Sequence, residues 1–178
     1  ISYQLSYIPC GPFEATGVAD ALAGLKNHAA EECPYEFWTD KTSAGNFKVT
    51  VPSSIRSRLG GAEGSILDVY GGEYEFDMFT VRLWKARGTD KGVTLKYGKN
   101  ITDLKQEEAI SNTITGIYPY WTDGDTALVT LPEKILTSEA AENFPYPRTI
   151  PVDLSSDFEE QPDADDLREA AYAYMNSH

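Results

Sequence analysis

Apolar and polar residues alternate along two neighbouring stretches near the middle of the chain. The first covers residues 79–84 and the second covers residues 93–97, and the turn between them contains Gly88 and Gly92. Alternation with a period of two gives a strand one apolar face, and glycine readily adopts the positive φ angles of tight turns. The pattern predicts a β-hairpin with these two stretches as its arms.

The strand that leads into this hairpin changes phase in its middle. Tyr74, Phe76 and Met78 share one face, whereas from Phe79 onward the apolar residues occupy the other face. Either a bulge lies near Met78, or the strand leaves one core and enters a second. We favour the second interpretation, which makes residues 73–85 a bridge between two subdomains.

Further runs of alternating or regularly spaced apolar residues predict the remaining elements. Strand-like runs cover residues 2–7, 35–39, 47–51, 110–121, 126–131 and 149–154. Apolar stripes at helical spacing predict helices over residues 16–33, 53–59, 62–70 and 163–175. Thr16 and Ser53 are suited to cap the first two helices. The strands on either side of residues 122–125 form a second predicted hairpin.

Together these elements predict an α+β fold built from antiparallel β-hairpins and a few helices. Residues 1–72 are expected to form an α+β subdomain, with a helix at about 16–33 and two short helices within 53–70. Residues 73–154 are expected to form a β-rich subdomain with two hairpins. Residues 155–178 are expected to form an acidic linker and a C-terminal helix.

The chain of 178 residues carries a net charge of −13, which is unevenly distributed. Residues 1–72 hold five basic and eight acidic groups, residues 73–110 hold seven of each, and residues 111–178 hold three basic and thirteen acidic groups. A nucleic-acid footprint has the opposite sign, so sequence-specific binding of DNA or RNA is disfavoured. No apolar run approaches the ~20 residues of a membrane span, so we expect no membrane partner.

The sulfur and imidazole groups are too few for a metal site. Cys10 and Cys33 are the only cysteines, and His28 and His178 are the only histidines. Their spacing matches no zinc motif, so we expect no metal and no other cofactor. We expect two reduced thiols, with a Cys10–Cys33 bridge as the alternative. His28 is typical of a packed or surface histidine, and nothing in the sequence places it beside a thiol.

Two groups of acidic residues invite a functional interpretation. Glu73, Glu75 and Asp77 alternate along one strand, so their carboxylates line one face about 7 Å apart. A glycosidase needs two carboxylates that converge across a cleft, so a solvated strand face is the preferred interpretation. Asp123 and Asp125 lack the rest of a calcium-binding loop and are typical of turn residues. We predict no catalytic residue.

Several phrases of the sequence are distinctive. They are Ile-Pro-Cys-Gly-Pro-Phe at residues 8–13, Leu-Asp-Val-Tyr-Gly-Gly-Glu-Tyr-Glu-Phe-Asp at 67–77, and Arg-Gly-Thr-Asp-Lys-Gly-Val to Tyr-Gly-Lys-Asn at 87–100. Residues 115–121 and 146–148 add two shorter matches. The chain resembles, over nearly its whole length, the prophage tail protein family, also described as tail-associated lysin, prophage endopeptidase tail or the N-terminal region of a phage antireceptor.

The resemblance implies a structural function. It implies part of the hub fold of a phage baseplate or tail tip, a homotrimer in the intact protein, other phage tail proteins as partners, and a role in tail assembly and host attachment. The implied location is the virion tail tip, after synthesis in the cytoplasm of the bacterial host. In that family, peptidoglycan hydrolysis or receptor binding resides further toward the C-terminus. We therefore expect this chain, which we interpret as a piece of a longer protein, not to be an enzyme.

Two alternatives remain open at this stage. One is a peptidoglycan hydrolase that uses acidic groups such as Glu73 or Asp77, and converging carboxylates in a groove would favour it. The other is a receptor- or carbohydrate-binding module. A shallow aromatic platform around Trp38, Trp84 or Trp121 would favour that function.

Overall fold

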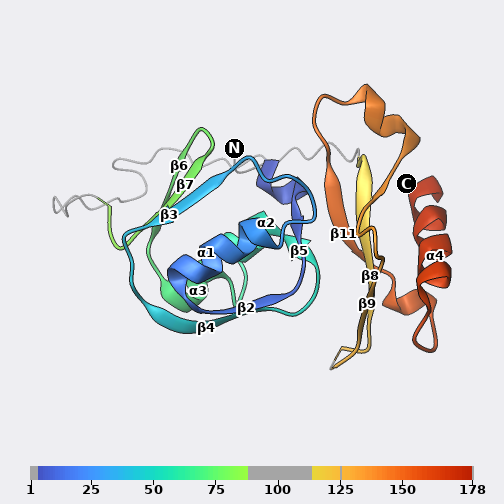
Figure 1. Ribbon diagram of the computed structural model, residues 1–178, viewed down its shortest axis with the longest axis horizontal. Helices are drawn as coiled ribbons and strands as arrows, with labels where there is room; N and C mark the ends of the chain where they lie inside the picture. Colours follow the sequence, from blue (N-terminus) through green and yellow to red (C-terminus); the bar gives the residue numbers. More distant parts are fainter. Residues whose placement is uncertain (1–3, 88–113, 125, 178) are drawn as a thin grey trace, which may run out of the picture.

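The chain folds into two lobes, each with its own hydrophobic core (Figure 1). A computed structural model describes residues 4–87, 114–124 and 126–177. The described residues form a mixed α+β structure, as the sequence predicts. Among the described residues, the first lobe comprises residues 4–87 and the second comprises those from 114 onward.

The elements of the first lobe follow one another closely. In chain order they are η1 (Gln4–Tyr7), β1 (Pro9–Cys10), β2 (Phe13–Gly17), α1 (Val18–Asn27), β3 (Glu36–Thr39), β4 (Ala44–Val49), β5 (Ser53–Ser54), α2 (Ile55–Leu59), α3 (Ile66–Tyr70), β6 (Glu73–Asp77) and β7 (Thr80–Trp84). Strands β2 and β4 pair antiparallel, while β7 lies between β3, to which it is parallel, and β6, to which it is antiparallel.

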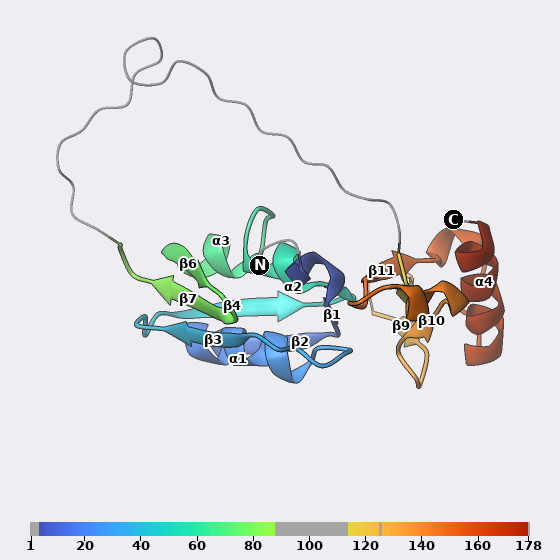
Figure 2. The same ribbon diagram turned by 90° about the horizontal axis from the view of Figure 1, so that it is seen from above.

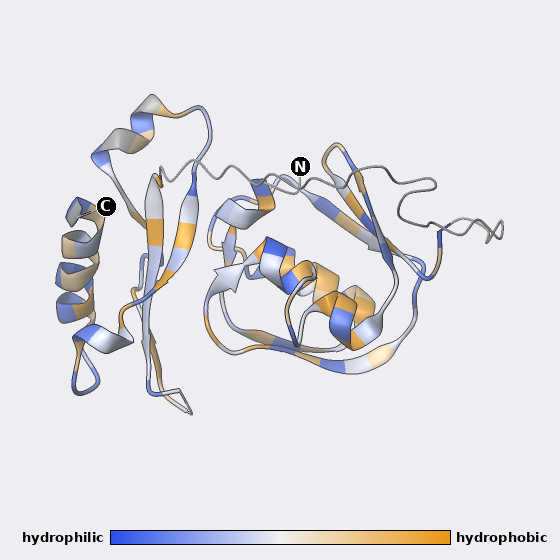
Figure 3. Cartoon of the chain, turned by 180° about the vertical axis from the view of Figure 1, so that it is seen from behind, coloured by the Kyte–Doolittle hydropathy of each residue, from blue (hydrophilic) through white to orange (hydrophobic). Residues whose placement is uncertain are grey.

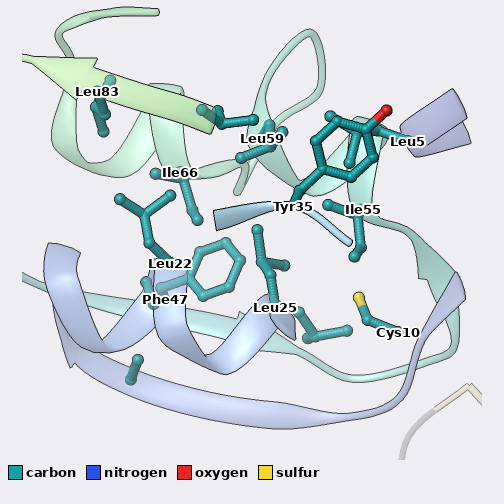
Figure 4. Close-up of a cluster of buried hydrophobic side chains, with 14 of the residues drawn as sticks. Leu5, Cys10, Leu22, Leu25, Tyr35, Phe47, Ile55, Leu59, Ile66 and Leu83 are labelled. Carbon is teal, nitrogen blue, oxygen red and sulfur yellow. The ribbon is translucent and has the colours of Figure 1, made fainter. Parts of the chain in front are cut away.

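The core of the first lobe forms around helix α1, which packs against β2 and β3. Leu22 and Leu25 of α1 lie in the same cluster as Phe47 of β4 and Ile66 of α3 (Figure 4). Burying each of these side chains contributes roughly 1.5–3 kcal/mol. A Cβ atom at Gly24 would lie 2.2 Å from Cε2 of Phe13, so only glycine lets β2 approach α1 this closely.

The second lobe is a sheet covered by one helix. Its elements are β8 (Gly116–Thr122), β9 (Leu128–Thr130), β10 (Leu136–Thr137), η2 (Glu139–Asn143), β11 (Thr149–Asp153), η3 (Ser155–Asp157) and α4 (Ala164–Ser177). β8 pairs with β11 in parallel and with β9 and β10 antiparallel. Figures 1 and 2 show this sheet between the first lobe and α4. Hydrophobic residues recur at intervals along β8 and β11 (Figure 3).

The predicted bridge between two cores is wrong, because residues 73–84 form a hairpin inside the first lobe. The turn is only two residues long, since Asp77 is paired with Thr80 and Phe76 with Val81. Reversing the chain at Met78 shifts the apolar phase without any change of core. Val81 belongs to the first cluster and Phe76 packs against it. The predicted boundary at residue 73 therefore moves to the end of this lobe.

The first arm of the hairpin predicted from residues 79–84 and 93–97 pairs with strands other than the predicted one. That arm is β7, but its hairpin partner is β6 and its other edge is paired with β3. Residues 93–97 lie outside the described residues. The second predicted hairpin is confirmed, because β8 and β9 pair antiparallel across the turn after Thr122.

Two predicted elements near the N-terminus differ from the structure. Residues 4–7, expected in a strand, form the 3-10 helix η1. The helix predicted over 16–33 covers only Val18–Asn27, with Gly17 rather than Thr16 as its N-cap. The helix ends there because the next residues form hydrogen bonds with the segment at β1. The Gly11 N–H donates to the His28 carbonyl, and the Ala30 N–H donates to the Pro9 carbonyl.

The helices predicted after residue 53 are confirmed, with shifted starts. Ser54 caps α2 and Ser65 caps α3, each accepting a backbone hydrogen bond through its hydroxyl. The C-terminal helix is present as α4, and Asp163 accepts from the N–H groups of Asp165 and Asp166. This helix is not a separate part, because Leu167 and Ala171 belong to the second core.

Substitutions in the two cores should be additive. Leu83→Ala and Leu167→Ala each remove a fully buried side chain, so each should lower the free energy of unfolding by about 2–5 kcal/mol. Because the two residues lie in different clusters, the double variant should lose the sum to within about 0.5 kcal/mol. Urea unfolding measures these values.

A matched pair within one core provides the control. Phe76→Ala combined with Val81→Ala should depart from additivity, because the two residues are paired across β6 and β7. Strong coupling between Leu83 and Leu167 would instead join the two clusters into one cooperative core.

Candidate functional site

The outer face of the β3–β7–β6 sheet collects most of the candidate residues. The register places Trp38 next to Arg82 on one side and Glu75 next to Arg82 on the other. Side chains alternate along strands, so Trp38, Arg82 and Trp84 project away from the face that carries Val81 and Leu83. The first lobe therefore turns a mixed aromatic and charged surface outward.

Two tryptophans meet on this face. The ring centroids of Trp38 and Trp84 are 4.8 Å apart, with an interplanar angle of 62°, an edge-to-face geometry that aromatic pairs favour. Trp38 is 44% exposed, whereas Trp84 is half-buried and its indole N–H donates to Oε2 of Glu75 at 2.8 Å. Trp121 does not join them, because it is buried in the second core.

Each of the three carboxylates on β6, those of Glu73, Glu75 and Asp77, has a hydrogen-bond or ion-pair partner. Arg82 lies 3.1 Å from Oδ2 of Asp77 and 3.7 Å from Oε2 of Glu75, and Arg87 lies 3.2 Å from Oε1 of Glu75. The backbone N–H of Arg87 donates to Glu73 at 2.8 Å. The carboxylates lie on one strand and do not converge across a cleft, so the face lacks the arrangement of a glycosidase pair.

Nothing in the sequence indicated that arginines would join the carboxylates on this face. Arg82 and Glu75 are neighbours because of the register of β6 against β7, which residue spacing alone does not give. Each exposed ion pair contributes about 0–1 kcal/mol, so the network orders the side chains more than it stabilises the fold. Chemically, the face offers indole surface, guanidinium donors and carboxylate acceptors.

The sulfur and imidazole groups stay apart from this face. Cys10 and Cys33 are both free and buried, as expected of reduced thiols. Burial raises the pKa of Cys10 to about 11 and also raises the pKa of Cys33. His28 is exposed and its ring stacks on Phe13 with centroids 4.9 Å apart. No group of three potential metal ligands lies among the described residues.

Asp123 is a turn residue, as predicted. Its Oδ1 accepts from the N–H groups of Thr126 at 3.0 Å and Ala127 at 2.9 Å, which closes the turn between β8 and β9. Asp125 lies outside the described residues. The carboxylate of Asp123 is thus used to satisfy backbone donors.

A second set of residues joins the two lobes. The Arg148 guanidinium lies 5.9 Å from the centroid of Tyr7, in the first lobe, and 5.5 Å from that of Phe144, in the second. Thr115, just before β8, holds Arg148 in place, because its hydroxyl accepts a hydrogen bond from the Arg148 N–H at 2.7 Å. Glu31 hydrogen-bonds the hydroxyl of Thr149 across the interface, and its burial raises the pKa of its carboxyl.

Comparison with known proteins gives no relative for this chain. No protein-family model, no curated protein and no solved structure matches it. The helices in the described part of the chain are too short or too polar to span a bilayer.

The Cys10 thiol should react slowly in the folded protein. A pKa near 11 leaves little thiolate at pH 8, so alkylation by iodoacetamide should be at least about 100-fold slower than in the urea-unfolded chain. Mass spectrometry of the Cys10 peptide measures both rates. Equal rates would contradict the buried site.

The same thiol gives a pH dependence of stability. The folded chain keeps the Cys10 proton to higher pH than the unfolded chain, so unfolding releases a proton once the pH exceeds about 9. The contribution of Cys10 to the free energy of unfolding is present below pH 9 and is lost as the pH rises to about 11. Cys10→Ala should flatten this part of the stability profile.

Proposed function

We propose that this chain is a structural part of a phage or prophage tail-tip hub, working in tail assembly and host attachment with other tail proteins. In the intact protein the hub is a homotrimer, located at the virion tail tip after synthesis in the bacterial cytoplasm. The chain itself is not an enzyme in this proposal. The observation that carries it is the position of the distinctive phrases, several of whose described residues support packing and turns.

The phrase at residues 8–13 supports the proposal through its backbone contacts. Ile8 accepts a hydrogen bond from the Ile55 N–H, and Pro9–Cys10 form strand β1 against β5. A Cβ atom at Gly11 would lie 3.4 Å from the Tyr118 hydroxyl, which belongs to the shorter phrase at 115–121. Two phrases about 100 residues apart thus meet at the interface between the lobes.

The phrase at residues 67–77 supports it in the same way. The Tyr70 hydroxyl donates to the Gly45 carbonyl and the Tyr74 hydroxyl donates to the Leu59 carbonyl, which ties α3 and β6 to β4 and α2. Gly72 has φ +115°, and a Cβ atom there would lie 2.6 Å from the Trp84 carbonyl oxygen. These residues are needed for the shape of the lobe.

Localisation in the particle tests the proposal. Antibodies raised against this chain should label one end of the tail when particles from the lysogen that encodes it are viewed by immunogold electron microscopy. Particles disrupted into tails and capsids should carry the chain in the tail fraction by mass spectrometry. Absence from the tails, or labelling of the capsid, would overturn the tail-tip function.

A second candidate function is binding of a cell-wall saccharide, and the pair of exposed Trp38 and half-buried Trp84 favours it. Aromatic faces cover the apolar faces of sugar rings, while the neighbouring Arg82 and Glu75 offer hydrogen bonds to hydroxyl groups. This site does not conflict with a structural role, because it lies on the surface of the first lobe.

A sedimentation assay with purified cell walls tests saccharide binding, and it also tests the hydrolase alternative. If the tryptophan pair binds saccharide, the chain should sediment with the walls and Trp38→Ala should reduce the bound fraction several-fold. Tyr172→Ala, which removes an exposed aromatic ring on α4, is the matched control. The supernatant should contain no muropeptides above buffer. Their release would support the hydrolase alternative and contradict the proposal.

A further inference from the structure

The tip of the β6–β7 hairpin carries one residue that its backbone geometry disfavours. Two-residue hairpin turns favour Asn-Gly or similar pairs, because their central residues adopt positive φ. Here the turn is Met78–Phe79, and Met78 has φ 49°, a conformation that residues with long side chains rarely adopt. Both side chains are also exposed, Met78 at 72% and Phe79 at 54%. Neither stability nor solubility explains the exposed Met78.

A groove lies beside this tip, with residues from both lobes along it. Its volume is about 330 Å³, and its apolar lining consists of Ile8, Pro34, Tyr35, Phe79, Tyr146 and Pro147. The rings of Tyr35 and Phe79 pack with centroids 5.7 Å apart, while Tyr146 is 64% exposed. We call Met78 together with this lining the tip–groove surface. Exposed aromatic clusters of this kind mark interaction sites.

The charge around the groove indicates the chemistry of its occupant. Glu31 and Glu32 line the groove together with the apolar residues, and Glu32 is exposed. The whole chain carries a net charge of −13, so its long-range field attracts cations. The carboxylates disfavour the anionic head groups of a membrane, and they attract the basic side chains of a polypeptide.

We propose that the tip–groove surface binds an extended polypeptide segment of a partner, one that carries apolar side chains together with lysine or arginine. A groove of this volume holds one or two side chains, which suits a segment better than a flat protein face. The basic side chains reach the carboxylates and the aromatic faces beside the groove. That the partner is another tail protein rests on the proposed function.

Fluorescence anisotropy with two synthetic peptides tests the binding. One labelled octapeptide alternates leucine with lysine, and the other alternates leucine with glutamate. The intact chain should bind the lysine peptide and not the glutamate peptide. Phe79→Ser and Tyr146→Ser should each weaken binding at least about tenfold, as expected for central aromatic contacts. Tyr172→Ser, which alters an exposed ring on α4, should leave it unchanged.

Met78→Gly gives a readout that a merely structural turn would not. Glycine relieves the positive φ, so the variant should unfold at a higher urea concentration, yet it should bind the lysine peptide several-fold more weakly. Higher stability with unchanged binding would remove Met78 from the surface.

Three results would overturn the proposal. They are equal binding of both peptides, equal loss of binding in Tyr172→Ser and Phe79→Ser, and binding to neutral phosphatidylcholine vesicles without binding to the lysine peptide. Urea unfolding of every variant identifies any loss of binding that comes from loss of folding. The peptide measurement is independent of tail localisation, so the surface and the tail-tip function can fail separately.

Discussion

Strand β8 holds the molecule together, because both of its faces are buried. Ile117 and Trp121 point into the second core, while the Tyr118 hydroxyl approaches Gly11 of the first lobe. Buried backbone groups must be hydrogen-bonded, and β8 meets this requirement with β11 on one edge and β9 and β10 on the other. The positions of the first lobe, of α4 and of the groove between the lobes all depend on this strand.

Local signals in the sequence predict much of the fold. The turn at Asp123 and the stripe of α4 are each set by residues a few positions apart, so the α+β class and the second hairpin follow from them. The starts of α2 and α3 were displaced, because Ser54 and Ser65 cap these helices instead of the positions that the sequence indicated. The end of α1 could not be predicted, because hydrogen bonds from a distant strand determine it. The hairpin at Met78 was missed because its turn lacks glycine and asparagine.

The candidate surfaces were less predictable than the fold. The sequence identified Trp38, Trp84 and the carboxylates of β6, but their arginine partners depend on strand register. Trp121 shares their chemistry, yet it faces a core. The tip–groove surface combines residues far apart in the chain, so spacing gives no sign of it. Tertiary structure, and not local pattern, determines which side chains become neighbours here.

The parallel pairing of β3 with β7 has a consequence for folding during synthesis. Strand β3 has no other strand partner among the described residues, and β7 follows it by about 40 positions. At about 5–20 residues per second, β3 waits for several seconds on the ribosome before β7 emerges. During that interval Phe37 and Trp38 have no sheet to pack on. The nascent first lobe therefore exposes an unpaired strand edge until its hairpin has been made.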